Sequence, residues 1–268
     1  MNSAGGGTYL ILLALAVLWS DRAGAENRAT GSVSSCRPAT FASGIAARVT
    51  DGRTLVLDDG RTVRLAGIES PAIASAAEAA TSFLQELLAG KTVVLKGTSE
   101  RDRHGRLTAH TFLGGTESER WIQGELVAAG HARVTANSGD DCAAELMRRE
   151  REARKAGLGL WSDPYYAVRS AEDPAALAGE RGRFAIVEGK VLSVRESGGT
   201  IYVNFGRRWS EDFTVTIAKR NEKSFTAAGM EPKALANRRV RVRGWIEERG
   251  GPWVEAIRPE QIELVERN

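Results

Sequence analysis

The side chains that most often bind metals or do redox chemistry are scarce in this sequence. It has two cysteines and three histidines, and His104, His110 and His131 do not cluster with other candidate ligands. Two cysteines exclude a Cys₄ zinc site and a disulfide-dense scaffold. The motifs G-x-x-x-x-G-K-[ST], H-E-x-x-H and C-x-x-C are absent, which removes the usual support for P-loop, zinc-protease or thioredoxin functions. His104 lies in an arginine-rich turn and could touch a ligand, whereas we expect His110 and His131 to be structural.

Arginines cluster in two stretches of the sequence, and one of them could contact a polyanion. Arg239, Arg241 and Arg243 alternate with valines, which on a strand would place the three arginines on one face. Such a face could bind single-stranded nucleic acid or simply be solvated, and we expect the solvated face. The aromatic residues near it in sequence are Tyr202, Phe205, Trp209 and Trp245.

The second arginine cluster, residues 148–155, is interleaved with glutamates. Glu145–Arg149 and Glu150–Arg154 have i,i+4 spacing, which predicts a solvated, salt-bridged helix face.

Composition sets wide limits on function. Of 268 residues, 42% are hydrophobic and 26% are charged, as in globular proteins, and the length suggests two domains. Lys and Arg number 37 against 34 Asp and Glu, giving a net charge of +3. This charge permits a polyanionic partner without requiring one.

The N-terminus has the pattern of an export signal. Residues 9–19 are an unbroken apolar run, too short to span a bilayer comfortably, and residues 23–25 read A-G-A. We expect residues 1–25 to be a signal peptide and the mature chain to begin at Glu26, without a stable membrane span. The alternative is an uncleaved anchor. Either way the protein is expected to be exported, to the periplasm or outside the cell.

Export bears on the two cysteines. In an oxidising compartment Cys36 and Cys142 permit one intramolecular disulfide, which would tie the N-terminal arm to the start of a helix. The alternative is two unpaired thiols.

The elements that must position these residues fall into two groups. Residues 45–50, 54–57 and 62–65 are predicted strands joined by Asp-Gly turns, and residues 93–95 and 107–112 are further strands. Predicted helices cover residues 72–88, 121–129 and 142–156, each followed by a glycine.

After a Pro-containing stretch, strands return in the second half. They are predicted at residues 184–194, 201–205, 213–217, 240–245 and 253–257, with a short helix near 231–236. Five strands with a helix between the third and fourth is the order of an OB-fold barrel.

Five short motifs of the first half resemble the staphylococcal nuclease (thermonuclease) family over residues 45–163. They are V-T-D-G-R-T, R-L-A-G-I-E-S-P, D-R-H-G-R, E-L-V-A-A-G-H-A-R-V and E-A-R-K-A-G-L-G-L-W. The resemblance implies an OB-fold five-stranded barrel carrying three helices. We therefore expect a mainly β protein with this barrel and a C-terminal OB-like five-stranded barrel. The expected division is an arm at 26–40, the nuclease-like domain at 41–166, a linker at 167–182 and the second barrel at 183–268.

The resemblance also implies a chemistry, calcium-assisted cleavage of phosphodiester bonds in DNA and RNA. Arg64 and Arg106 stand where the family has its phosphate-binding arginines, which also stabilise charge that develops on the phosphate. Glu69 stands at a metal-ligating aspartate, Ser70 at a threonine whose carbonyl faces the metal, and Asp51 is kept. A bound Ca²⁺ would neutralise the phosphate and orient the attacking water.

Two positions depart from the family pattern. Where the family has a second metal-ligating aspartate, this chain has Arg53, and where it has the water-positioning glutamate, this chain has Ala72. A guanidinium and Ca²⁺ a few ångströms apart repel each other by several kcal/mol at an intermediate dielectric.

Three functions remain open. The first is binding of nucleic acid or another phosphate-rich ligand with little or no cleavage, where Arg53, Arg64 and Arg106 form a metal-free anion clamp. The second is an active metal-dependent nuclease in which Glu69, Asp51 and Glu78 hold the ion. The third is a non-catalytic interaction module of the cell envelope, with an envelope protein as partner, in which Arg53 pairs with Glu69.

Overall fold

The computed structural model describes residues 1–2, 36–114, 120–136 and 142–265. The cleavage site before Glu26, almost all of the predicted signal peptide and most of the predicted arm lie outside these residues. The described residues from Cys36 onward belong to one compact unit. Within the described part of the chain, no helix is long and apolar enough to cross a membrane.

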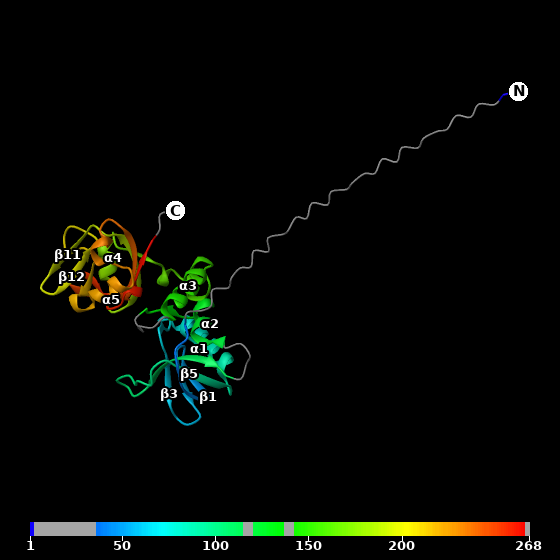
Figure 1. Cartoon of the computed structure of the whole chain (residues 1–268). Coiled ribbons are helices and arrows are strands. Elements are labelled where there is room, and N and C mark those ends of the chain that lie inside the picture. The colour runs from blue at the N-terminus through cyan, green and yellow to red at the C-terminus, as the bar shows by residue number, and fades with distance from the viewer. Residues whose placement is uncertain (3–35, 115–119, 137–141, 266–268) are drawn as a thin grey trace. The chain divides into compact units, whose positions relative to one another are not determined.

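Five strands of the first half close into a barrel (Figure 1). They are β1 (Thr40–Asp51), β2 (Thr54–Leu57), β3 (Thr62–Leu65), β5 (Thr92–Lys96) and β6 (Leu107–Leu113). β1 pairs with β5 through its first half and with β2 through its second half, β2 pairs with β3, and β5 pairs with β6. A parallel pairing of β3 with β6 closes the ring. The fold is therefore mainly β, and the predicted OB-fold barrel is confirmed.

Alternate residues of these strands fill the barrel, as the period of two requires. The fully buried side chains include Leu55, Val63, Leu65, Val93 and Leu95. The first strand begins at Thr40 rather than at residue 45 because residues 40–45 pair with β5, a partner that no local pattern indicates.

The three predicted helices of this half are present. They are α1 (Ala74–Leu88), α2 (Ile122–Ala128) and α3 (Cys142–Lys155). Their fully buried leucines and isoleucine recur at helical spacing and pack into the same core as the barrel strands: Leu84, Leu88, Ile122, Leu126 and Leu146.

Short elements complete this half. β4 (Ile68–Glu69) pairs antiparallel with β8 (Arg133–Val134), and β7 (Arg120–Trp121) pairs with β6. Two 3₁₀ turns follow α3, η1 (Gly159–Ser162) and η2 (Pro164–Tyr166). The β4–β8 pairing places Glu69 directly opposite Arg133.

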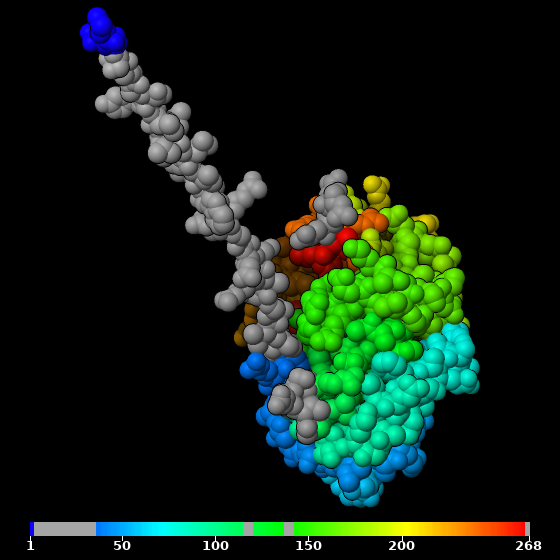
Figure 2. All heavy atoms as spheres, turned by 90° about the vertical axis from the view of Figure 1, so that its right-hand side faces the viewer, coloured from blue at the N-terminus to red at the C-terminus, as the bar shows by residue number. Residues whose placement is uncertain are grey.

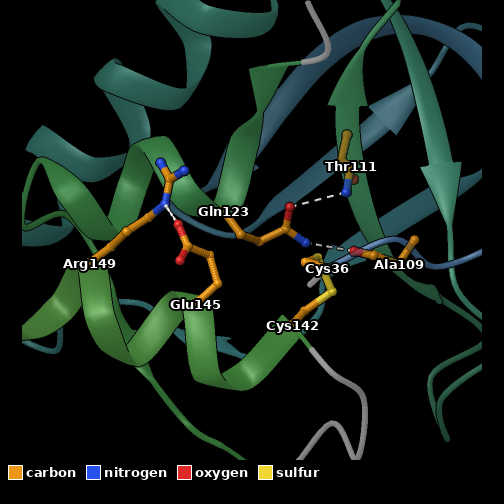
Figure 3. The surroundings of a disulfide bond; sticks show 7 residues. All are labelled: Cys36, Ala109, Thr111, Gln123, Cys142, Glu145 and Arg149. Carbon is orange, nitrogen blue, oxygen red and sulfur yellow. Dashed lines mark hydrogen bonds and ion pairs between the residues drawn. A yellow bond between two sulfur atoms is a disulfide. The ribbon is translucent and has the colours of Figure 1, made fainter. Parts of the chain in front are cut away.

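The described half-cystines form the predicted disulfide. Cys36 is bonded to Cys142 at the first residue of α3, and both are buried (Figure 3). Beside it, the buried Gln123 side chain accepts a hydrogen bond from the Thr111 amide at 3.0 Å and donates one to the Ala109 carbonyl at 2.8 Å. The alternative of two unpaired thiols is wrong.

The second half holds two sheets around a separate core. One has the order β17 (Ile262–Leu264), β14 (Arg239–Trp245), β10 (Phe184–Lys190) and β9 (Arg169–Ser170). The other has the order β11 (Ser193–Ser197), β12 (Thr200–Asn204), β13 (Thr214–Ala218), β16 (Gly251–Glu255) and β15 (Glu247–Arg249). Helical segments are α4 (Pro174–Ala178), η3 (Lys219–Asn221), α5 (Glu222–Ala227), η4 (Pro232–Leu235) and η5 (Pro259–Gln261).

The predicted strand at 184–194 is divided between these sheets. The amide of Val191 bonds to the Arg238 carbonyl, and the next amide, of Leu192, bonds to the Asn204 carbonyl, so the chain changes sheets there. The strand pairings leave the two sheets separate, and a second five-stranded barrel is not confirmed.

The segment 167–182 differs from the expected linker. It contains β9 and α4, and Leu177 of α4 is fully buried in the core of the second half. A short helix between two strands was expected at 231–236, where the structure has the 3₁₀ turn η4, and α5 precedes it.

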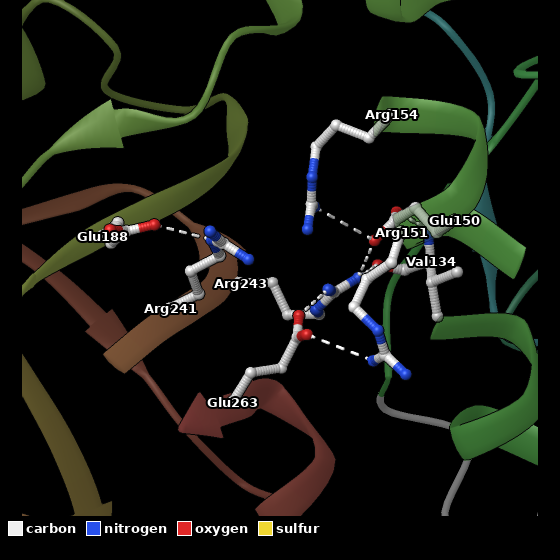
Figure 4. Close-up of polar contacts among 8 residues, drawn as sticks. All are labelled: Val134, Glu150, Arg151, Arg154, Glu188, Arg241, Arg243 and Glu263. Carbon is white, nitrogen blue, oxygen red and sulfur yellow. Dashed lines mark hydrogen bonds and ion pairs between the residues drawn. The ribbon is translucent and has the colours of Figure 1, made fainter. Parts of the chain in front are cut away.

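The predicted solvated face of Arg239, Arg241 and Arg243 is wrong for Arg243. This side chain is 1% exposed and donates to Glu150 of α3 at 2.7 Å, to the Val134 carbonyl at 3.0 Å and to Glu263 of β17 (Figure 4). Arg239 and Arg241 both pair with Glu188 of β10.

The helix face around residues 148–155 is also less solvated than predicted. The Glu145–Arg149 pair is present at 2.9 Å, and Arg154 lies 3.8 Å from Glu150. However, Glu150 is fully buried, because the second half covers this part of α3 through Arg243. Arg151 also reaches Glu263 at 3.4 Å, and on the face shown in Figure 2 the green atoms of the middle of the chain adjoin the red atoms near the C-terminus.

Candidate functional site

A cavity of about 700 Å³ opens at the end of the barrel beside β3, β4 and the β5–β6 connection. The charged residues that line it are Arg53, Arg64, Glu69, Lys96, Glu100, Arg101, Asp102 and Arg103. Three of the predicted site residues, Arg53, Arg64 and Glu69, therefore line one concave surface, whereas Arg106 is not among its lining residues.

The turn between β1 and β2 directs Arg53 to this site. The Asp51 carboxylate accepts the Arg53 amide at 2.9 Å, which holds the turn. A side chain at Gly52 would clash with Ala80 of α1, so the turn lies close against that helix. The Arg53 guanidinium then donates a short hydrogen bond to Glu69 of β4.

Arg64 lies beside this pair. Its guanidinium is 3.8 Å from the same Glu69 oxygen. Burial lowers the pKa of Arg64, and the positive charges of Arg53 and Arg106 lower it further, partly offset by Glu69 and Asp102. The Arg64 guanidinium is thus close enough to the other two to be repelled by both, which is the condition under which a bound anion is stabilising.

Arg106 is held by the turn that it ends. The Asp102 carboxylate accepts the amides of His104 and Arg106 and the Arg106 side chain, at 2.8–3.0 Å. Burial alone would raise the pKa of Asp102, but these hydrogen bonds lower it to about 2. Asp102 therefore stays ionised at neutral pH and fixes both the turn and Arg106.

Two more predicted residues flank a second cavity of about 320 Å³. Asp51 and Ser70 line it, and Arg53 and Glu69 line both cavities. The Ser70 hydroxyl is buried, and among the described residues it has no hydrogen-bond partner. Ser70 directly follows Glu69 in the sequence, and it lines the same cavity as Arg53 and Glu69.

The start of α1 is bound to a residue far along the chain. The amides of Ala72 and Ile73 both donate to the Tyr166 hydroxyl at 2.9 Å. Glu78 is exposed on α1 and lines neither cavity, so the structure does not bring it to the site.

Sequence reasoning missed Asp102 and Tyr166, and it placed Trp245 elsewhere. Trp245, at the end of β14, is 49% exposed and lines both cavities. The Asp102 turn has a local sequence signal, because the aspartate accepts a hydrogen bond from the amide of His104, two residues further on. No local sequence signal indicates the contacts of Tyr166 and Trp245.

The histidines and cysteines were also candidates for a ligand or metal site. His104 is exposed and accepts from Arg103 at 3.1 Å, whereas His131 packs on Phe83 and its pKa is lowered by burial. Within the described ranges, the only three histidine, cysteine or carboxylate side chains close enough to share a metal ion are Cys36, His110 and Cys142. The two sulfurs of that group are joined in the disulfide.

A comparison with known protein families matches residues 62–163 to the family described as staphylococcal nuclease homologue. The matched part contains Arg64, Glu69 and Arg106 and begins after Arg53. No curated protein matches the chain significantly. The match, with the closed barrel, identifies a staphylococcal nuclease-like domain in the first half and points to a nuclease-like or nucleic-acid-binding function.

Proposed function

On the premise of a staphylococcal nuclease-like domain, we propose that this protein binds nucleic acid or another phosphate-rich ligand with little or no cleavage. The observation that carries the proposal is the contact of Arg53 with Glu69. The carboxylate that stands at a metal-ligand position of the family is bound by a guanidinium.

The charges of the site favour an anion. Five cationic side chains line the first cavity against three carboxylates, so its lining keeps a positive charge. Arginine side chains present paired N–H donors that match phosphate oxygens. A phosphate group beside Arg64 would relieve the repulsion that lowers its pKa.

The donor set does not fit Ca²⁺. Ca²⁺ takes six to eight oxygen ligands. Glu69 is bound by Arg53 and has Arg64 nearby, and the Asp51 carboxylate accepts a hydrogen bond from the Arg53 amide. Glu78 lines neither cavity. The site also has Ala72 where the family has its water-positioning glutamate. These features support a degenerate calcium site.

We also propose that the protein acts outside the cytoplasm, in the periplasm or secreted. The apolar run and the A-G-A pattern at the N-terminus support export. The Cys36–Cys142 disulfide supports it too, because structural disulfides form and persist in oxidising compartments.

The test is binding and cleavage by the mature chain with single- and double-stranded DNA and RNA, in Ca²⁺, in Mg²⁺ and in EDTA. We expect binding in EDTA that weakens steeply with salt and leaves the substrates intact. Arg64→Gln should weaken binding about tenfold, the size of a charged hydrogen bond. Arg120→Gln removes an equal charge from the Glu125 ion pair of the same domain and should change binding little.

Two outcomes contradict the proposal. Cleavage that needs a divalent ion and is lost in Arg106→Gln would establish a rebuilt nuclease. Absence of binding to nucleic acid and to inorganic polyphosphate would favour the envelope-interaction module, for which the Arg53–Glu69 pair is simply a satisfied salt bridge.

A further inference from the structure

The outer face of the β11–β12–β13–β16–β15 sheet carries a groove of about 850 Å³ that shares no lining residue with the candidate site. Strand register places its residues in rows. Arg195 of β11 is opposite Tyr202 of β12, and Tyr202 is opposite Thr216 of β13. In the next row, Asn204 is opposite Thr214, and Thr214 is opposite Trp253 of β16. The intervening residues Ile201 and Val203 face the core.

Two aromatic rings line this groove, and a third, buried ring lies in the pocket beside it. Tyr202 and Trp209 line the groove, and a smaller adjoining pocket, which shares both residues, extends to Trp253. Trp209 is 73% exposed in the loop between β12 and β13. An indole with this much exposed surface is a platform on which a flat ligand can stack.

Three arginines accompany the rings. Arg195, Arg207 and Arg249 line the groove and are exposed, and Arg249 lies over the Trp253 ring at 4.6 Å. Within the described part of the chain, none of the three has a carboxylate within ion-pair distance, whereas the neighbouring Arg208 pairs with Glu211 at 2.9 Å.

Among the residues that the structure describes, neither the groove nor the adjoining pocket is lined by an aspartate or glutamate. Glu247 and Glu255 share this sheet face by register but line neither. The charged residues in the lining of the groove are therefore all positive.

We propose that this groove binds single-stranded nucleic acid. Unpaired bases would stack on Trp209 and Tyr202, and the backbone phosphates would contact Arg195, Arg207 and Arg249. A duplex keeps its bases stacked inside and offers the rings no base face, so the groove selects single strands. This second site is separate from the arginine cluster of the nuclease-like domain.

The test measures fluorescence anisotropy of a labelled thymidine 12-mer on the mature full-length chain in EDTA. The Arg64→Gln/Arg106→Gln background removes two of the three arginines proposed to bind phosphate in the first domain. In it, Trp209→Ala should weaken binding about tenfold, the effect of losing one stacked base. Arg207→Gln should also weaken binding and lower the salt slope by about 0.7, as for one lost single-strand phosphate contact.

Arg208→Gln is the matched control. It removes the same charge from the same loop, at a side chain that is paired with Glu211 and does not line the groove. Its binding should equal that of the background. Because Trp209 is exposed, Trp209→Ala should leave folding intact, and equal melting temperatures of the variant and its background check this.

Unchanged binding in Trp209→Ala and Arg207→Gln would overturn the proposal, as would equal weakening by Arg208→Gln. Competition by an acidic polysaccharide as strong as that by unlabelled single strand, with duplex DNA inert, would assign the groove to a glycan instead. In the native background, a loss from Trp209→Ala with none from Arg64→Gln would retain this site and reject the first-domain proposal. A loss from Arg64→Gln with none from Trp209→Ala would retain the first-domain proposal and reject this site.

Discussion

At the residue scale, the identity of position 53 determines which ion is stabilised beside Glu69. The Arg53 guanidinium contacts the Glu69 carboxylate, so a divalent cation on Glu69 would lie within ~4 Å of a positive charge. At an effective dielectric near 20, the repulsion amounts to several kcal/mol. A phosphate oxygen at the same place is attracted by Arg53 and Arg64 together.

Replacing this side chain should therefore create affinity for calcium. Arg53→Asp removes the repelling cation and adds a carboxylate beside Asp51 and Glu69, and we expect Ca²⁺ to bind at least about tenfold more tightly than to the native chain. Isothermal titration calorimetry measures the Ca²⁺ affinity of each variant. Arg48→Asp makes the same change of charge on an exposed residue of β1 and is the control. Equal Ca²⁺ affinities in the two variants would mean that Arg53 does not exclude the ion.

The sequence predicted some site residues and not others, for a physical reason. Arg53 pairs with Glu69, as the interaction-module hypothesis expected. The two residues lie in two of the short motifs, and the barrel fold brings these motifs together. The Tyr166 hydroxyl accepts from the amide of Ala72 across 94 residues. A contact of this kind depends on how η2 packs on α1, and no local pattern encodes it.

At the element scale, two glycines let the end of α2 meet the turn after α3. Gly130 has φ +73°, and a Cβ there would lie 2.1 Å from the Leu158 carbonyl oxygen. Gly159 has φ +52°, and its Cβ would lie 2.3 Å from the Gly130 carbonyl oxygen. The two backbones touch, and the Leu160 amide donates to the Gly130 carbonyl at 2.9 Å.

Gly130→Ala should consequently destabilise the protein by at least about 2–3 kcal/mol, from backbone strain and from displacement of this contact. Urea denaturation measures it. Gly157 also has a positive φ, but nothing lies within 4 Å of its Cβ position, so Gly157→Ala should cost only about 1 kcal/mol. Equal losses would show that conformation alone, and not the contact between α2 and η1, requires glycine at position 130.

Element prediction succeeded where local pattern and tertiary partner agree. The three helices of the first domain carry an apolar face and a glycine stop, and their bounds lie within two residues of the expected ones. The segment 167–182 contains prolines, and no local pattern shows that its Leu177 is buried against the second core. The change of sheet at Val191 likewise depends on a distant partner, the Arg238 carbonyl.

At the scale of the whole molecule, a buried charge cluster joins the two halves. Arg243 of β14 pairs with the fully buried Glu150 of α3, and Glu263 of β17 pairs with Arg243 and Arg151 (Figure 4). Arg133 adds a second link by donating to the Phe184 carbonyl at 2.5 Å. Sequence alternation placed Arg243 on the correct strand face but could not show that α3 covers it, because that contact spans 93 residues.

Removing one member of this cluster should destabilise the whole chain. Arg243→Met leaves Glu150 buried without its close partner, and we expect a loss of about 3–5 kcal/mol in the free energy of unfolding, measured with urea. The more exposed Arg239→Gln, which also removes an ion pair on β14, should cost at most about 1 kcal/mol. The double variant Arg243→Met/Glu150→Gln removes the unpaired charge of Glu150 but keeps an acceptor for the Val134 amide. It should therefore recover part of the lost free energy of unfolding.

The pH dependence of stability separates a charge effect from a packing effect. Burial alone would raise the pKa of Glu263, but the charges of Arg243, Arg154 and Arg151 lower it below 4.5. Because the folded pKa is the lower one, the contribution of Glu263 is fully present above pH 4.5 and is lost as the pH falls through the folded pKa. Arg243→Met removes the largest attraction, so its unfolding free energy should fall less steeply than that of the native chain between pH 5 and pH 3. Parallel pH curves would mean that Arg243 joins the halves by its packing and not by its charge.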